Sequence, residues 1–317
     1  MHYAVVSTAS TAFRAWRLLL FGGICLLLFT SCVGVSRAPT EPVGVRILRD
    51  WTFATADNQP LQLDLYLPEH YGQPLPIIIW LHGGGWMFGT RARCPLASWA
   101  LRGYAIASVS YRTSDITAPI IFPAQLHDCK AAVRWLRVNA WRFGCDGERI
   151  GVVGVSAGAH LAALLGTTAN DAALEGDLGE TGMSSQIQAV AALFPPTDLL
   201  ALEQQDPHDM NVALMDFALL DGRPSERPAL ARSASPALQA DRTSAPFLIA
   251  HGRDDGMIPY QQSELLHEAL RNAGASSILM LFDHLPHSDE ALDQQELQGA
   301  MQTFFADKLH PPMIDEK

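Results

Sequence analysis

The stretch RIGVVGVSAGAH, from Arg149 to His160, decides the expected fold. Its apolar run stops at Ser156, and glycines stand two residues before and two residues after that serine. A strand that turns directly into a helix needs small residues at these two positions, because the two elements pass very close together. Ser156 is then either a nucleophile exposed on a sharp turn or only a small residue at a strand–helix junction. A G-x-S-x-G match can arise by chance in a chain of this length, so other parts of the chain must decide between the two interpretations.

Strand and helix patterns alternate along most of the chain. Strict alternation of apolar and other residues predicts a half-buried strand over 61–67. Mainly apolar runs predict further strands over 75–82, 104–111, 150–155, 187–194, 246–252 and 277–282. Helices are predicted over 123–141, 157–165, 261–272 and 289–309. This alternation predicts an α/β fold with a mostly parallel sheet and helices on both faces.

The predicted helix over 123–141 is amphipathic. Its apolar residues recur at spacings of three and four. The polar side chains expected on the opposite side are Gln125, Lys130, Arg134 and Arg137. We assign residues 45–310 to one α/β domain. Residues 198–236 are too long for a simple connection, so we expect a small helical cap there.

A second glycine-rich motif, WLHGGGWMFG, lies upstream at residues 80–89 and follows a predicted strand. Three successive glycines let backbone N–H groups approach a ligand without obstruction by side chains. Beside a nucleophile, such a loop would form an oxyanion hole, and we expect the N–H groups of Gly84, Gly85 and Ala157 to form it. His82 is expected to hold the loop by hydrogen bonds. The aromatic side chains of Trp86 and Phe88 suggest an apolar wall of the acyl pocket. Plain packing in the core is the alternative.

Acidic and basic partners for Ser156 occur after the last two predicted strands. The sequence RDDGMIP offers Asp254 and Asp255, and DHLPHSDE offers His284 and His287. A serine nucleophile needs a base, and the base needs an acid that orients it. The order serine, acid, histidine is the one found on α/β-hydrolase sheets, where ligands bind at the carboxyl ends of the strands.

The span from Gln62 to Phe304 resembles bacterial α/β-hydrolase esterases of the hormone-sensitive-lipase-like group, and is most similar to carbohydrate esterases of the acetylxylan/feruloyl type. The resemblance rests on HGGGW, on GVSAG and on longer phrases at 122–140, 149–168 and 251–270. It implies that Asp255, the fifth residue of an H-G-x-x-D phrase, is the acid and that His287 is the base. Asp254 and His284 are the alternatives.

Two positions depart from the pattern of that family. Ala159 stands where these enzymes usually have a further glycine, and HLPHS replaces the usual glycine-rich turn before the base. Neither change removes a catalytic group. The implied activity is hydrolysis of carboxylic esters through an acyl-enzyme on Ser156, without metal or cofactor, on short acetyl or aryl-acyl esters of carbohydrates or small alcohols.

Two other function classes share this fold. A serine peptidase of the prolyl-oligopeptidase kind has the same triad, but usually brings a propeller domain and an aromatic residue where this chain has Ala157. A non-catalytic binding module typically loses the serine or the histidine, and here both are present. The net charge of −11 leaves no large basic surface and argues against nucleic acid as a partner.

The N-terminus has the layout of an export signal over residues 1–31. Arg14 and Arg17 precede an apolar run, LLLFGGICLLLF, which is shorter than the roughly 20 residues of a membrane-spanning helix. The ending LLFTSC resembles the lipobox of bacterial lipoproteins, although Phe29 replaces the usual aliphatic residue. We therefore expect lipidation at Cys32, a tether over 32–44 and a lipid-anchored protein of the bacterial envelope. An ordinary cleaved signal and an uncleaved anchor are the alternatives.

Three cysteines follow in the exported part of the chain. Cys94, Cys129 and Cys145 are widely spaced and form no C-x-x-C motif, so no metal site is expected. An oxidising compartment would allow one disulfide, between Cys129 and Cys145, and buried free thiols are the alternative.

Overall fold

The computed structural model describes residues 41–115, 118–205 and 218–311. The signal, Cys32 and most of the tether lie outside these residues, so those assignments stay predictions. The described chain builds one eight-stranded sheet in the order β1-β2-β4-β3-β5-β6-β7-β8. The strands are β1 (Val45–Ala56), β2 (Gln59–Pro68), β3 (Leu75–Leu81), β4 (Ala105–Val109), β5 (Cys145–Val155), β6 (Ala189–Leu193), β7 (Phe247–Gly252) and β8 (Ser277–Phe282).

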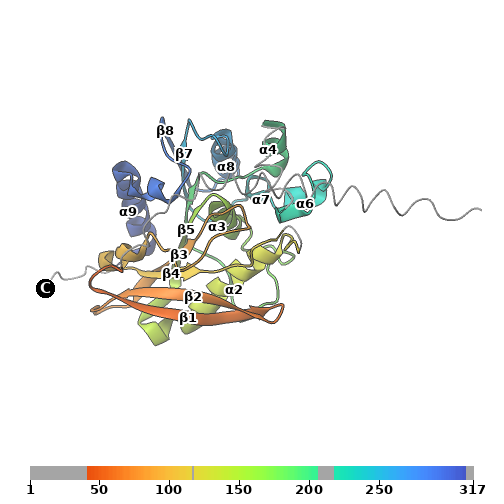
Figure 1. The fold of residues 1–317 in the computed structure, drawn as a ribbon. Coiled ribbons are helices and arrows are strands. Elements are labelled where there is room, and N and C mark those ends of the chain that lie inside the picture. Colours follow the sequence, from red (N-terminus) through yellow and green to blue (C-terminus); the bar gives the residue numbers. More distant parts are fainter. Residues whose placement is uncertain (1–40, 116–117, 206–217, 312–317) are drawn as a thin grey trace, which may run out of the picture. The chain divides into compact units, whose positions relative to one another are not determined.

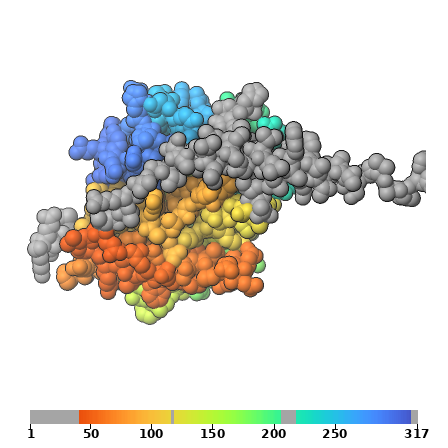
Figure 2. Space-filling view, in the orientation of Figure 1, coloured from red at the N-terminus to blue at the C-terminus, as the bar shows by residue number. Residues whose placement is uncertain are grey.

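The sheet is mostly parallel, as the sequence predicts. Strands β3 to β8 run parallel to one another, whereas β2 pairs antiparallel with both β1 and β4. Strands β3, β4, β6 and β7 are buried over their whole length, as expected for a sheet covered on both faces. The first and last strands lie at opposite edges of the sheet. In Figure 2 the red-orange and the blue parts of the described chain accordingly lie on opposite sides.

Helices cover both faces of the sheet (Figure 1). One core contains side chains from α2 (Ala124–Asn139), α3 (Ala157–Thr167) and α8 (Gln261–Asn272). The other core contains side chains from the 3-10 helix η1 (Ala97–Arg102) and from α9 (Gln295–Leu309). Two further 3-10 helices, η2 (Ala140–Phe143) and η3 (Asp289–Asp293), flank α2 and α9. The predicted α/β-hydrolase architecture is confirmed.

The region expected to form the cap contains short helices. They are α4 (Leu199–Gln205), α6 (Pro228–Ser233) and α7 (Pro236–Gln239). Residues 206–217 lie outside the described part, so the role of this region as a cap stays a prediction.

Strand β1 is absent from the sequence prediction, because its pattern is irregular. In the sheet of the described residues it is an edge strand beside β2, and its register shifts between Leu48 and Trp51 and again between Thr52 and Ala54. These shifts break the alternation of buried and exposed residues that identifies a half-buried strand. The predicted helix over 289–309 is also divided, since Gln294 has extended backbone between η3 and α9.

The polar side of α2 is not solvated, contrary to the amphipathic pattern. Gln125, Lys130 and Arg134 are buried. The Lys130 ammonium donates to the carbonyl of Thr168 at 2.6 Å and to Glu175 at 3.1 Å. Arg134 donates to the carbonyls of Glu175 and Leu178. Sequence periodicity missed this burial because a segment more than 30 residues away covers the helix and neutralises its charges.

Candidate active site

Ser156 lies on the turn between β5 and α3 and has strained backbone geometry. Its φ is +52° and its ψ is −121°, a conformation that residues with a side chain rarely adopt. Its N–H donates to the carbonyl of Leu193 on β6 at 3.0 Å, which ties the turn to the sheet. The turn therefore holds the serine where the strand ends and the helix begins.

Two glycines permit this turn by their lack of a side chain. A Cβ on Gly154 would lie 2.7 Å from the backbone nitrogen of Ala159. A Cβ on Gly158 would lie 2.7 Å from the carbonyl carbon of Leu81. Strand and helix thus pass as closely as the G-x-S-x-G spacing predicts, while the methyl group of Ala159 is fully buried in the core.

Replacing Gly158 by alanine should therefore damage both stability and activity. Forcing a methyl group against the β3 backbone is expected to lower the free energy of unfolding by about 1–3 kcal/mol. Urea denaturation and ester hydrolysis measure the two effects. Gly299→Ala in α9 is the control, because nothing lies within 4 Å of its added Cβ and the helix should gain about 0.5–1 kcal/mol. Unchanged stability in Gly158→Ala would contradict the close packing.

The structure brings Ser156, His287 and Asp255 together. His287 Nε2 lies 2.9 Å from Ser156 Oγ, and His287 Nδ1 lies 2.7 Å from Asp255 Oδ2. The serine and the histidine are 131 residues apart in sequence. Asp255 follows β7, and His287 follows β8 through a short loop. The contacts have the geometry in which a histidine can take the serine proton while the acid fixes the tautomer of the ring.

The Asp255 carboxylate is fully buried and fully hydrogen-bonded. Its Oδ1 accepts from the N–H groups of Met257 at 2.8 Å and Ile258 at 3.0 Å. Burial by itself would raise the pKa of Asp255, but hydrogen bonds from His251, His287 and the Ile258 N–H outweigh it, and the pKa is lowered. Asp255 is therefore the carboxylate that stays charged beside the base.

The alternative pair, Asp254 and His284, lies at the surface. His284 Nδ1 is 2.6 Å from Asp254 Oδ2, and the side chains are 88% and 52% exposed. The hydrogen bond raises the pKa of His284 and lowers that of Asp254. Neither residue is hydrogen-bonded to Ser156 within the described chain. Together with His287 they line an open pocket of about 310 Å³.

Phe194 is a residue of the site that the sequence did not single out. It follows β6 directly, is completely buried and has a φ of +43°, which is strained for a bulky side chain. The centroid of its ring lies 4.4 Å from the centroid of the His287 imidazole. An observed backbone outlier at this place indicates that the fold presents the ring to the base. No short motif marks Phe194, since its role depends on contacts between three strand ends.

The HGGGW loop lies beside the turn at Ser156. A Cβ on Gly83 would be 3.5 Å from the Cβ of Ser156, which shows how closely the loop approaches. Gly84 has a φ of +115°, and its carbonyl accepts from Met87 and Phe88 in a tight turn. Within the described residues, the N–H groups of Gly84, Gly85 and Ala157 have no hydrogen-bond partner. Their assignment to an oxyanion hole stays a prediction.

His82 and Trp86 are both part of the packing of this loop. His82 Nδ1 lies 2.9 Å from the carbonyl of Gly83, and the ring stacks on Tyr111 at 4.4 Å. Burial lowers the pKa of His82. Trp86 is 1% exposed and packs edge-on against His160, so it forms no open wall, whereas Phe88 is half exposed.

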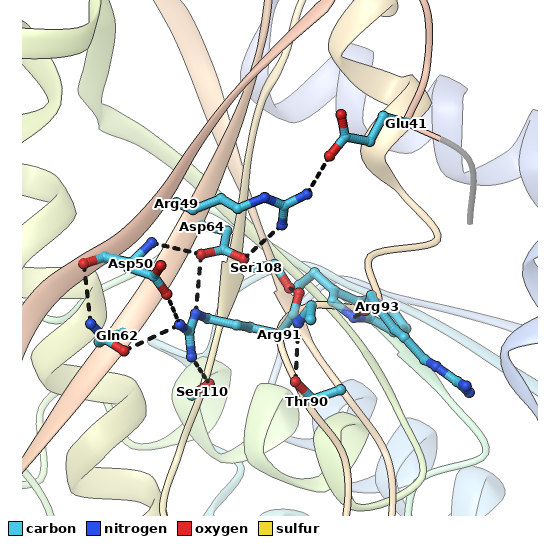
Figure 3. Close-up of polar contacts among 12 residues, drawn as sticks. Glu41, Arg49, Asp50, Gln62, Asp64, Thr90, Arg91, Arg93, Ser108 and Ser110 are labelled. Carbon is cyan, nitrogen blue, oxygen red and sulfur yellow. Dashed lines mark hydrogen bonds and ion pairs between the residues drawn. The ribbon is translucent and has the colours of Figure 1, made fainter. Parts of the chain in front are cut away.

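Arg91 fastens the far end of the same loop to the sheet (Figure 3). Its guanidinium donates to the buried carboxylate of Asp64 at 3.1 Å, to Ser110 at 3.2 Å and to Gln62 at 3.1 Å, and it pairs with Asp50. A loop held at both ends can keep its N–H groups in fixed positions.

The described residues contain no group of three or more His, Cys, Asp or Glu side chains arranged to hold a metal ion. Cys94, Cys129 and Cys145 are buried free thiols, so the Cys129–Cys145 disulfide does not form. Among the helices in the described chain, none has the length and apolar character needed to cross a membrane.

Comparisons with known proteins give the chain a family and esterase relatives. A model of the BD-FAE family matches residues 63–270. Esterase LipQ of Mycobacterium tuberculosis is 33% identical over 225 residues, which cover 70% of this chain and 51% of LipQ. A probable isoprenylcysteine α-carbonyl methylesterase of Arabidopsis thaliana is 28% identical over 268 residues, covering 79% and 53%. The chain thus spans about half the length of these curated relatives.

Solved structures of esterases share the fold. A truncated carbohydrate esterase from gut microbiota has a TM-score of 0.76 and 27% identity, over 86% of this chain and all of that chain. The propionate-bound esterase Est2 of Thermogutta terrifontis has a TM-score of 0.68 and 25% identity, over 87% of this chain and all of that one. Because the family model covers more than half of the sequence, the chain belongs to the BD-FAE family of α/β-hydrolases.

Proposed function

We propose that this protein is a serine hydrolase that cleaves carboxylic esters through an acyl-enzyme on Ser156. The single observation that carries the proposal is the continuous set of contacts from Ser156 Oγ to His287 at 2.9 Å and from His287 to Asp255 at 2.7 Å. Membership of a family with esterase relatives supports the same reaction class. Neither a metal nor a cofactor takes part in the proposed reaction.

The proposed reaction has two acyl-transfer steps. His287 Nε2 accepts the proton of Ser156 while the serine oxygen attacks the ester carbonyl. The N–H groups of Gly84, Gly85 and Ala157 hold the negative oxygen of the tetrahedral intermediate, where one such donor typically contributes about 3 kcal/mol. His287 then protonates the alcohol that leaves. Water repeats the sequence on the acyl-enzyme and releases the acid.

We further propose short acyl groups, acetyl or aryl-acyl, on carbohydrates or small alcohols as the substrate class. The carbohydrate esterase with the same fold and the binding of propionate to the Thermogutta esterase support this choice. A panel of p-nitrophenyl esters from acetyl to long-chain acyl, with acetylated xylan and feruloyl esters, tests it. The highest kcat/KM is expected on short esters, and a preference for long chains would contradict the proposal.

An aminoacyl-nitroanilide in the same panel separates the other function classes. Hydrolysis of the ester alone, abolished in Ser156→Ala, is the result expected of an esterase. Hydrolysis of the anilide would indicate a peptidase. Turnover of neither substrate would indicate a binding module.

Activity is expected to fall on the acid side with the binding of one proton. His287 must be unprotonated at Nε2 to accept the serine proton, and an imidazole normally changes charge between about pH 5 and 8. Burial acts to raise the pKa of Asp255, but its hydrogen bonds lower the pKa overall, so Asp255 stays charged over that range. A plot of log kcat/KM against pH should thus have an acid limb of slope about 1. Full activity down to about pH 4 would contradict the assignment of the base.

We also propose that the chain is exported and anchored in the bacterial envelope by lipid on Cys32. The basic flank, the short apolar run and the following TSC support this proposal. Cells that express Cys32→Ser should incorporate no labelled palmitate into the protein, whereas the native sequence should be labelled. Equal labelling of both would end the idea of a lipid anchor at Cys32.

A further inference from the structure

His251 is a completely buried histidine behind the Asp255 carboxylate. It lies near the end of β7, where burial leaves no solvent contact. Its Nε2 is 2.9 Å from the carbonyl oxygen of Ile258 and 3.2 Å from Asp255 Oδ2. Its Nδ1 is 2.7 Å from the hydroxyl of Ser263 on α8. The residue is thus part of a polar network in the core, and the reaction described above makes no use of it.

The neighbours of the ring determine which nitrogen carries hydrogen. Both oxygens next to Nε2, from Ile258 and Asp255, can only accept a hydrogen bond, so Nε2 must donate. The Ser263 hydroxyl can both donate and accept, and in the neutral ring it donates to Nδ1. Contacts on both nitrogens therefore fix the ring in one orientation.

The single Nε2–H of His251 lies between two acceptors, the Ile258 carbonyl at 2.9 Å and Asp255 Oδ2 at 3.2 Å, so Asp255 shares this donor with the Ile258 backbone. Backbone N–H groups of Met257 and Ile258 hold Oδ1, while the imidazoles of His287 and His251 share Oδ2. A buried carboxylate that lacks one of its donors is costly, because no water can replace the missing hydrogen bond. The carboxylate is thus held from two sides, in the orientation that meets the Nδ1–H of His287.

On the basis of the proposed function, we propose that His251 is a positioning residue, which holds Asp255 Oδ2 in line with the imidazole of His287. A continuous chain of contacts then runs from Ser263 through His251, Asp255 and His287 to Ser156. His251 touches no reacting atom and acts only through the acid.

Loss of this donor should change the proton affinity of the Asp255–His287 pair. Among the described residues, the titratable side chains on the elements that carry this pair include His251, which contacts Asp255, and the exposed Asp254–His284 pair on the same two loops. A carboxylate that has lost a donor attracts a proton on the adjacent imidazole more strongly. The acid limb of kcat/KM is therefore expected to move to higher pH, which a residue that only fills space would not cause.

The experiment compares His251→Leu with His251→Gln, whose side-chain amide can donate from nearly the same place as imidazole Nε2. We expect His251→Leu to lower kcat about 10–100-fold, to leave KM within about threefold and to raise the acid limb by about half a pH unit or more. His251→Gln should recover most of kcat and the native acid limb. Ser263→Ala keeps the His251 ring but removes the contact at its Nδ1. It should move the acid limb to higher pH by a smaller amount than His251→Leu does.

His267→Gln is the matched control, because it removes a second histidine–serine contact, to Ser277 at 2.9 Å, that does not reach Asp255. It should leave the acid limb unchanged. Equal losses in His251→Leu and His251→Gln with a native acid limb, or full activity in both, would overturn the proposal. If His251→Leu does not fold, the test uses the acid limbs of the other two variants. The proposal then requires a native acid limb in His251→Gln and an acid limb at higher pH in Ser263→Ala.

The titration of His287, followed by NMR in a Ser156→Ala background, needs no turnover. A titration of His287 that moves to higher pH in His251→Leu supports the positioning role even if no ester is hydrolysed. Failure of the proposed esterase function can therefore be told apart from failure of the positioning role. An unchanged titration would overturn the positioning role even if the esterase activity is established.

Discussion

Replacing Ser156 by alanine is expected to lower kcat for p-nitrophenyl acetate by about 10⁵–10⁶-fold, the loss typical when a serine hydrolase loses its nucleophile. The hydroxyl is the only group that the substitution removes, and the strained backbone at φ +52° already accommodates a Cβ. The variant should therefore fold like the native protein. Steady-state hydrolysis measures the loss of kcat, and urea denaturation of the same preparation measures whether the variant is as stable as the native protein.

A contaminating esterase is the chief risk to this measurement. The activity of the native chain should disappear in proportion to titration of Ser156 by a serine-directed organophosphate. A variant that folds normally and retains more than a hundredth of the native kcat would show that Ser156 is not the nucleophile.

Replacing Asp255 by asparagine is expected to lower kcat by about 10⁴-fold, because it leaves His287 in the wrong tautomer. The N–H groups of Met257 and Ile258 face one side of the group and would hold the amide oxygen there. The amide NH₂ would then face the imidazoles of His287 and His251. His287 would have to accept at Nδ1, which places its hydrogen on Nε2, against the serine that it should deprotonate.

Asp254→Asn is the matched control for that variant. It changes the neighbouring carboxylate, which is exposed and paired with His284. We expect its kcat to stay within about threefold of the native value, since exposed ion pairs contribute little. Comparable losses in Asp254→Asn and Asp255→Asn would contradict the assignment of the acid.

The fold could be predicted from sequence because its strands are local features. The central strands are continuous apolar runs, and the glycines around Ser156 mark a junction whose geometry tolerates little else. Strand β1 was missed because its alternation is broken by register shifts. The burial of Lys130 and Arg134 was missed because Glu175, which pairs with both, lies more than 40 residues away.

The candidate site was predictable where chemistry requires a residue type. A serine, an acid and a histidine at strand ends identify themselves by kind and order, and a family resemblance distinguished Asp255 from Asp254. Phe194, His251 and Arg91 could not be found in this way. Phe194 and Arg91 contact residues distant in sequence, and many residue types in many places can make such contacts. His251 lies only four residues before Asp255, but the turn that brings its ring back to the carboxylate leaves no pattern in the sequence.

The most direct test of the account is to locate the covalent adduct after reaction with paraoxon. The intact native protein should gain one diethylphosphoryl group, and peptide mapping should place it on Ser156, with loss of ester hydrolysis in the same proportion. An adduct on another residue, or complete loss of activity with Ser156 unmodified, would contradict the central claim that Ser156 is the nucleophile.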